Sequence, residues 1–413
     1  MQQTSAHSSP PPGYALPSLV LANRVSLAQS FGLVALRGVV PAEIAPPMSV
    51  ELSAAGQSAT FEAAQVGRQD AAGNWQLMVH VLTQLLPNGP TDVSVTARWP
   101  DGTILAFGDL CLQVCNEGRL ATEVTADLRA FGTPTLLPRV IDSSLFPYRD
   151  GLSKAWFDTI VPTEVPLSFE QPATLDDAHR HLERWGFCIL PARLPATLIA
   201  SFREQLDHAI ETKQLAYEPG TSQRIHNAHR LPAGRDIWLY PPVLEFLQSH
   251  FRDTPCACQT LTYVNGSEQN GHQDTIHLTP YPAGFMCGVW IALEDVVPDS
   301  GELFVYPGSH KTPRLLAGDL GLEKVDTDYS SYVKFDAEIG RLIESGGYTR
   351  AVYRPKAGQI LVWHENLIHG GSQRADRDRT RLSIVSHYFA KGSVAYYDSR
   401  GEAAGLEILP AQA

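Results

Sequence analysis

The chain has 413 residues, more than a single hydrophobic core usually holds, and so indicates two domains or one domain with a large appendage. Its 32 basic against 44 acidic residues give a formal charge of −12, which would repel phosphate backbones and excludes nucleic acid as an expected partner. No segment reaches the roughly 18 consecutive apolar residues of a membrane span, and residues 1–14 lack the features of a secretory signal. We therefore expect a cytoplasmic protein that begins with a disordered tail at 1–14.

Residues 15–118 alternate short apolar segments, such as LVALRGVV and WQLMVHVL, with turns rich in Gly, Pro and Asn. Short strands at regular spacing with such turns predict an immunoglobulin-like β-sandwich. No group of His, Cys or acidic residues stands out in it, so we expect an accessory role. Prolines interrupt residues 119–165, which we interpret as a connecting segment. Its apolar residues predict that it packs partly on the next domain; they are Leu136, Val140, Leu145, Phe146 and Trp156.

Residues 166–395 begin with two predicted helices. Thr174 can cap the first and Gly186 can end it, while residues 196–213 keep apolar residues on one helical face. From about residue 256 the sequence is rich in β-branched and aromatic segments, about eight of which read as strands. Strands that follow helices in this way favour a double-stranded β-helix of the jelly-roll or cupin-like kind, braced by helices. The expected fold is thus mostly β with α, and residues 396–413 are expected to form a C-terminal tail.

One histidine and one aspartate in this domain have the spacing of metal ligands. His272 and Asp274 are two residues apart, so on a strand their side chains would leave the same face. A second histidine, His369, follows some ninety residues later at the end of another predicted strand. Two imidazoles and one carboxylate on one face of an iron leave three positions for a chelating co-substrate and oxygen. The sequence therefore predicts a metal site of His272, Asp274 and His369.

An arginine at the start of a later strand could hold the co-substrate. Arg381 shares a strand face with Ser383, Val385 and His387, and its guanidinium could bind a carboxylate through two parallel hydrogen bonds. We expect it to anchor the distal carboxylate of 2-oxoglutarate. Arg379 lies on the same face and is the competing choice.

Residues 170–395 resemble the phytanoyl-CoA dioxygenase family of iron and 2-oxoglutarate oxygenases, through GSEQNGHQDTIHL, MCGVWIALEDVVPDSGELFVYPGSHK and WHENLIHGGS followed by RLSIVSHYF. The resemblance implies Fe(II), with 2-oxoglutarate and O2 as co-substrates, at His272, Asp274, His369 and Arg381. It also implies that Trp290 lines the co-substrate pocket and that His310 is structural. In the family a serine often follows the HG pair and contacts the co-substrate. This chain has Gly371 there, followed by Ser372, which puts the contact with the co-substrate in doubt.

The resemblance implies hydroxylation of a small-molecule C–H bond with release of succinate and CO2, because Asp274 occupies the position that chloride takes in halogenases. A cupin-like metalloprotein or a binding protein without turnover is the alternative function. The substrate and the oligomeric state stay open, and so do desaturation, ring formation and epimerisation, which start from the same hydrogen abstraction as hydroxylation. We expect residues 217–235 and 311–350 to surround the mouth of the site, the second as a lid.

Four other histidines and one arginine are further candidates for the site. His277 and His364 have the opposite strand parity from the predicted ligands Asp274 and His369, and His387 is a third candidate, so all three are read as surface or pocket histidines. Arg224 and His226 could lie near the mouth and contact substrate or co-substrate.

Overall fold

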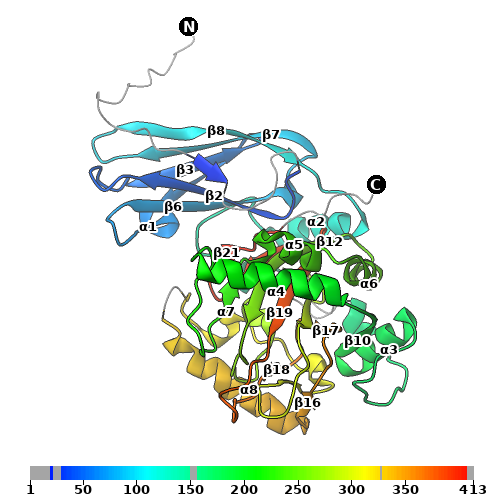
Figure 1. Cartoon of the computed structure of the whole chain (residues 1–413). Coiled ribbons are helices and arrows are strands. Elements are labelled where there is room, and N and C mark those ends of the chain that lie inside the picture. Colours follow the sequence, from blue (N-terminus) through cyan, green and yellow to red (C-terminus); the bar gives the residue numbers. More distant parts are fainter. Residues whose placement is uncertain (1–18, 22–28, 149–155, 326–327, 407–413) are drawn as a thin grey trace.

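The computed structural model describes residues 19–21, 29–148, 156–325 and 328–406, so the tail expected at 1–14 lies outside the described residues. Figure 1 shows two β-rich regions, one built from the first third of the chain and one that also carries most of the helices. Among the described residues, no helix is both long enough and apolar enough to cross a membrane. The mostly β architecture with helices is as predicted.

The N-terminal region consists of two antiparallel sheets that share one apolar core. Alternate residues of β7, among them Val93, Val95 and Ala97, are buried, as expected for strands with one face on a core. The first sheet contains β1 (Leu19–Leu21), β2 (Leu33–Val40), β6 (Trp75–Leu82), β5 (Gly67–Gln69) and β9 (Leu136–Leu137). The second contains β4 (Gln57–Glu62), β3 (Ser49–Ala54), β7 (Gly89–Arg98) and β8 (Ile104–Val114), and α1 (Ala63–Val66) follows β4.

The connecting segment is more regular than predicted. It begins with α2 (Arg119–Phe131), whose residues Leu120, Val124 and Leu128 are buried in the core of the second region. The fourfold spacing of these residues is helical, and no proline interrupts them. Phe146 is buried in the same core, as expected, after η2 (Ser143–Leu145). Val140 is 45% exposed, and its Cα lies beside Gly401 of the second region, so the segment packs partly on that region, as predicted. The side chain of Trp156 lies outside the described residues.

The second region is built on a six-stranded sheet, with helices on one of its faces (Figure 1). The strands in order are β10 (Phe187–Arg193), β17 (Gln359–His364), β14 (Met286–Ala292), β19 (Ser383–Ala390), β12 (Pro255–Tyr263) and β11 (Ile225–His226). The helices are α3 (Leu175–Trp185), α4 (Ala196–Glu211), α5 (Pro232–Trp238) and α6 (Pro241–Phe251). Thr174 caps α3 through a hydrogen bond from the Asp177 amide, and Gly186 ends it in the left-handed conformation, as predicted.

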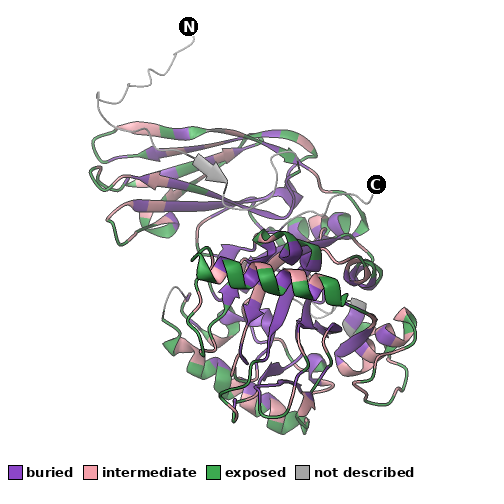
Figure 2. Cartoon of the chain, in the orientation of Figure 1, coloured by how far each residue is buried: buried purple, intermediate pink, exposed green. Residues whose placement is uncertain are grey.

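Because side chains alternate along each strand, one face of this sheet packs under the helices, and the other, which we call the chemical side, faces the metal-ligand candidates. On β14 and β19, Val289, Ile291 and Ile384 join the core under the helices. Trp290 and Val385 face the other way, into a smaller core. Figure 2 shows that the strands of this sheet are buried, whereas α4 keeps an exposed outer face.

A smaller sheet faces the chemical side of the large one. It contains β16 (Ala351–Tyr353), β15 (Leu303–Val305) and β18 (His369–Gly371), and His272 adds a bridge to His369. In chain order, β12, the His272 segment, β14, β15, β16, β17, β18 and β19 pass back and forth between the two sheets, except that β15 and β16 are neighbours in the small sheet, in the manner of a double-stranded β-helix. Outside it lie α7 (Ala317–Leu320) and α8 (Val333–Gly346), which contributes Phe335 and Ile339 to a core shared with Ile368.

The chain beyond residue 395 does not leave the second region as a tail. β20 (Val394–Tyr397) and β21 (Glu402–Ala403) form a third sheet with β13 (Thr279–Tyr281). The N-terminal sheets contact this sheet, because Ala403 N donates to His80 Nε2 at 3.3 Å and Arg37 lies 3.7 Å from Glu402. Residues 396–406 therefore connect the two regions, and residues 407–413 lie outside the described residues.

Candidate metal centre

Three buried side chains converge between the two sheets. Ligand atoms of His272, Asp274 and His369 all lie within 4.8 Å of one another. Oδ1 of Asp274 is 3.6 Å from Nε2 of His272 and 3.8 Å from Nε2 of His369. The structure thus brings together the residues that the sequence selected.

Backbone pairing fixes the two histidines. His272 N donates to His369 O at 2.9 Å, and His369 N donates to His272 O at 3.0 Å. Nδ1 of His272 donates to Asn270 O, and Nδ1 of His369 donates to Leu367 O, each at 2.9 Å. This places the proton on Nδ1, so each Nε2 carries a lone pair that can bind a metal, and in His272 that nitrogen accepts from Gln269 Nε2 at 3.2 Å.

Asp274 begins a short 3-10 turn, η5 (Asp274–Ile276), instead of continuing a strand. Its amide donates to Glu365 O at 3.1 Å, and Trp363 Nε1 donates to its Oδ2 at 2.6 Å. One carboxylate oxygen is therefore held by the protein, and Oδ1 faces the two imidazoles.

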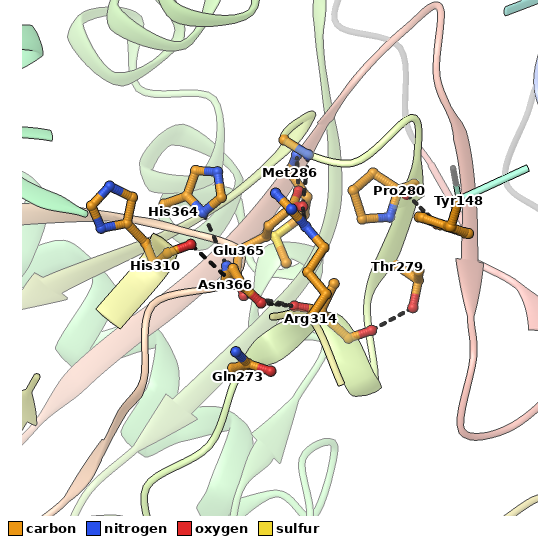
Figure 3. A network of polar contacts seen from close by, with 12 residues as sticks. Tyr148, Gln273, Thr279, Pro280, Met286, His310, Arg314, His364, Glu365 and Asn366 are labelled. Atoms are coloured by element: carbon orange, nitrogen blue, oxygen red, sulfur yellow. Dashed lines mark hydrogen bonds and ion pairs between the residues drawn. The ribbon is translucent and has the colours of Figure 1, made fainter. Parts of the chain in front are cut away.

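Glu365 organises the chain behind Asp274 (Figure 3). Its carboxylate accepts hydrogen bonds from the amides of Gly284 and Met286 at 2.6 and 3.1 Å, and from Arg314 Nε at 3.0 Å. Because the carbonyl of the same residue binds Asp274 N, this buried network ties the metal-ligand turn to β14 and to the segment before α7.

The protonation states of the triad suit a metal site. Burial lowers the pKa of His369 to about 4, although Asp274 acts in the opposite direction. Burial alone would raise the pKa of Asp274, but the neighbouring His369 and His387 hold it well below its usual range. At neutral pH the site therefore offers a neutral imidazole at His369 and an ionised carboxylate at Asp274, the forms that bind divalent metals. This donor set fits Fe(II) with open positions.

Arg381 lies in the same cavity as the triad and is 2% exposed. One terminal nitrogen donates to Ser383 Oγ at 3.0 Å, while its buried Nε has no hydrogen-bond partner among the described residues. The ring centroids of Trp290 and Tyr263 lie 5.5 and 5.8 Å from its guanidinium carbon. Burial lowers the pKa of Arg381 to about 10, which leaves it charged at neutral pH.

Arg381 makes no ion pair within the described part of the chain, and such a buried cation favours an anionic ligand. The competing choice, Arg379, is wrong, because it is exposed and pairs with Asp376 at 3.3 Å.

The cavity has a volume of about 170 Å³, and most of the predicted site residues line it. Trp290, Arg224, His226 and His277 do so with the triad and Arg381, whereas Ser383 acts through its hydrogen bond to Arg381. The parity argument for His277 does not hold, because the turn after Asp274 is not a strand. The Tyr332 hydroxyl lies 3.0 Å from its Nδ1.

His387 also lines the cavity, with Nε2 3.4 Å from Asp274 Oδ2, whereas His364 does not line it. At Gly371, a Cβ would lie 2.2 Å from Ser267 Oγ, so the position leaves no room for a serine. Ser372 does not replace it, since its hydroxyl accepts from Arg350 outside the cavity.

The sequence missed several residues of the cavity wall. The predicted mouth segment 311–350 contributes Tyr329, and in an adjoining cavity Tyr332, Phe335 and Asp336. Other lining residues that were not predicted are Gln259, Tyr263, Gln269, Tyr397 and Arg400. The parity of β12 could have indicated Gln259 and Tyr263, whereas Tyr397 and Arg400 fell in the supposed tail.

Comparison with known proteins agrees with this site. Residues 182–380 match the model of the phytanoyl-CoA dioxygenase (PhyH) family. This segment belongs to the phytanoyl-CoA dioxygenase family. The family consists of iron and 2-oxoglutarate-dependent oxygenases, and the buried triad with Arg381 fits that chemistry.

Among curated relatives, phytanoyl-CoA dioxygenase domain-containing protein 1 of Danio rerio is 47% identical over 45 residues, which are 11% of this chain and 16% of the relative. The protein of the same name in Mus musculus is 34% identical over 83 residues, 19% of this chain and 28% of the relative. The matched part of the chain thus spans less than a third of the length of these relatives.

Solved structures of similar fold include the non-haem α-ketoglutarate-dependent carbocyclase SnoK from nogalamycin biosynthesis, with 18% identity and a TM-score of 0.45 over 58% of this chain and 97% of SnoK. They also include EctD from S. alaskensis with 2-oxoglutarate and 5-hydroxyectoine, with 16% identity and a TM-score of 0.40 over 55% of this chain and 79% of EctD.

Proposed function

We propose that the protein is an Fe(II)- and 2-oxoglutarate-dependent dioxygenase that hydroxylates a C–H bond of a small molecule and releases succinate and CO2. The observation that carries this proposal is the position of a buried, unpaired arginine in the same cavity as a His, Asp and His triad. A metal site alone would not explain Arg381, whereas a dicarboxylate that chelates the metal and pairs with the arginine would.

The residues of the chain then have distinct roles. His272, Asp274 and His369 would hold iron, which when bound activates oxygen with 2-oxoglutarate as reductant. Arg381, supported by Ser383, binds the distal carboxylate and so orients the co-substrate. The walls exclude water from the reacting centre, since Trp290 and Trp363 are almost fully buried.

We propose hydroxylation as the outcome because Asp274 fills the ligand position that chloride takes in halogenases. A cupin-like metalloprotein, or a binding protein without turnover, is the second candidate function. Two buried histidines and a carboxylate would serve it equally well, but it gives Arg381 no ligand.

We also propose that the two N-terminal sheets form an immunoglobulin-like accessory domain. Support comes from their antiparallel strands around one apolar core and from the cavity, since every residue that lines it lies at position 224 or later. The proposed function therefore rests on the second region.

Succinate formation from 2-oxoglutarate tests the proposal. Iron-reconstituted wild type, under air, should produce succinate above His272→Ala and Arg381→Ala, because uncoupled turnover needs no substrate. Arg379→Ala is the matched control, since it removes an exposed arginine two residues away and should retain wild-type turnover. Absence of both succinate formation and metal-dependent 2-oxoglutarate binding in wild type would favour the metalloprotein or binding candidate.

A further inference from the structure

The cavity has two arginines beyond the charges that would balance bound iron and 2-oxoglutarate. Its charged lining residues, apart from histidines, are Arg224, Arg381, Arg400 and Asp274. Iron(II) with Asp274 would carry one positive charge, and 2-oxoglutarate with Arg381 would carry one negative charge, so these two pairs cancel. Arg224 and Arg400 remain, in a protein whose formal charge is −12.

Both remaining arginines are at the open end of the cavity. They are exposed, as are His226 and Tyr329 beside them in the lining. Arg224 and Arg400 both act on His226, where burial and then the two positive charges lower its pKa. The two guanidinium groups, which come from residues far apart in sequence, thus act on one position at the mouth.

Within the described residues, this pair of charges is only partly neutralised. Arg224 donates to the neutral amide oxygen of Gln269 at 3.0 Å. Arg400 lies 3.5 Å from Glu402, but the same carboxylate is 3.7 Å from Arg37, so one acid is shared by two arginines. Asp336 lines the adjoining cavity with Arg224, but not the cavity that contains the metal ligands.

Polar and aromatic groups connect the mouth to the metal ligands. Gln269, which accepts from Arg224, lies with its Nε2 3.2 Å from Nε2 of His272. Tyr397 lies under Arg400, whose guanidinium carbon is 5.6 Å from its ring centroid, and its hydroxyl is 3.5 Å from Gln259. A molecule held by the arginines would therefore extend past neutral side chains toward the triad.

We propose that the substrate carries a carboxylate or phosphate group, which Arg224 and Arg400 bind at the mouth while the carbon to be oxidised points toward the triad. This inference rests on the proposed function. It assigns the two arginines to substrate and not to 2-oxoglutarate, which Arg381 holds. The preferred ligand geometry is a planar or tetrahedral oxyanion between two guanidinium groups.

Binding of matched small probes tests this assignment without turnover. The full-length protein, loaded with Fe(II) and saturated with 2-oxoglutarate under anaerobic conditions, is titrated calorimetrically with phenylacetate, phenyl phosphate and neutral phenylacetamide. We expect at least one anion to bind at least about tenfold more tightly than the amide, and the tighter anion identifies carboxylate or phosphate as the preferred group.

Arg224→Gln and Arg400→Gln should each weaken anion binding about tenfold, and the double variant should bind anion and amide alike. Both side chains are exposed, so glutamine should not disturb folding. Arg379→Gln is the matched control and should keep the preference. The affinity for 2-oxoglutarate should stay within about twofold of wild type in these variants and should fall in Arg381→Gln.

The outcomes separate this inference from the proposed function. If wild type binds 2-oxoglutarate in a metal-dependent manner but does not prefer the anions, or if the double variant keeps the preference, the assignment of the mouth is wrong and the proposed function stands. If wild type does not bind 2-oxoglutarate, the proposed function itself fails.

Discussion

Two groups of buried histidines lie on opposite sides of one short chain segment, and only one has the chemistry of a metal site. His369 belongs to the first group, where its ring centroid is 4.5 Å from that of His272. His364, five residues earlier, belongs to the second, where it stacks on Phe157 at 4.8 Å and lies 5.7 Å from His310. All of these histidines are buried, so burial alone does not distinguish the two groups.

The difference lies in the carboxylate and in access to a cavity. Asp274 faces the first group, and its Oδ1 is available beside the two imidazoles. The nearest acid in sequence to His364 is Glu365, whose carboxylate is occupied by Arg314 and two backbone amides (Figure 3). Within the described residues, the first group alone offers three clustered ligand atoms. In this protein, a clustered carboxylate and an opening to the cavity distinguish the candidate ligand histidines from the second group.

The largest expected effect compares the same substitution in the two groups. His369→Gln should abolish measurable binding of Fe(II), because the substitution removes one of three protein ligands. The loss of affinity should exceed the roughly 10–100-fold loss that is typical when a residue that only supports a ligand is replaced. His364→Gln should leave metal affinity within about threefold of wild type, because His364 lies outside the cavity. Anaerobic calorimetry measures both. Equal losses in the two variants would contradict the distinction drawn between the groups.

A smaller loss is expected when the support of Asp274 is removed. Trp363→Phe keeps an aromatic ring but deletes the 2.6 Å hydrogen bond to Oδ2 of Asp274, so the affinity for Fe(II) should fall by about 10–100-fold. Trp185→Phe is the matched control, because its Nε1 donates to Val165 O outside the site. Unchanged affinity in Trp363→Phe would show that the turn at Asp274 is held by its backbone contacts alone.

The sequence predicted the site better than it predicted the surrounding walls. His272, Asp274, His369 and Arg381 were candidates by residue type and strand parity, and they could be selected because the motifs around them resemble the phytanoyl-CoA dioxygenase family. Strand parity does not by itself bring Asp274 to the same site as His272, however. Asp274 begins a 3-10 turn, so it is the contacts with Trp363 and Glu365, distant in sequence, that direct its carboxylate.

Long-range packing explains the misplaced C-terminal boundary. Residues 396–406 have no strong strand pattern of their own, yet β20 pairs with β13 more than a hundred residues earlier, and Ala403 contacts His80 in the N-terminal region. The turn between β20 and β21 places Arg400 in the cavity wall. Such pairings depend on the complete fold, and sequence periodicity does not report them.

The smallest expected effect concerns the stability of the second histidine group. His250 also belongs to this group, because its ring centroid lies 5.0 Å from that of Phe157. Burial lowers the pKa of both His250 and His310 to about 3. In the unfolded chain these rings would take up a proton near pH 6.5, so between pH 6.5 and 3 the unfolded state binds more protons than the folded state. The stability that each neutral ring contributes is therefore present above pH 6.5 and is lost as the pH falls toward 3.

His310→Gln isolates the contribution of one ring. Between pH 6 and 4, the free energy of unfolding of wild type should fall more steeply than that of the variant, by about 1.4 kcal/mol per pH unit for one proton. Urea unfolding at several pH values measures the two slopes, so a constant loss of packing in the variant does not affect the test. His208→Gln, on the exposed face of α4, is the matched control for replacing a histidine that is not buried. If His310→Gln keeps the wild-type slope, His310 is protonated in the folded protein, and the second group is not the neutral structural counterpart of the metal centre.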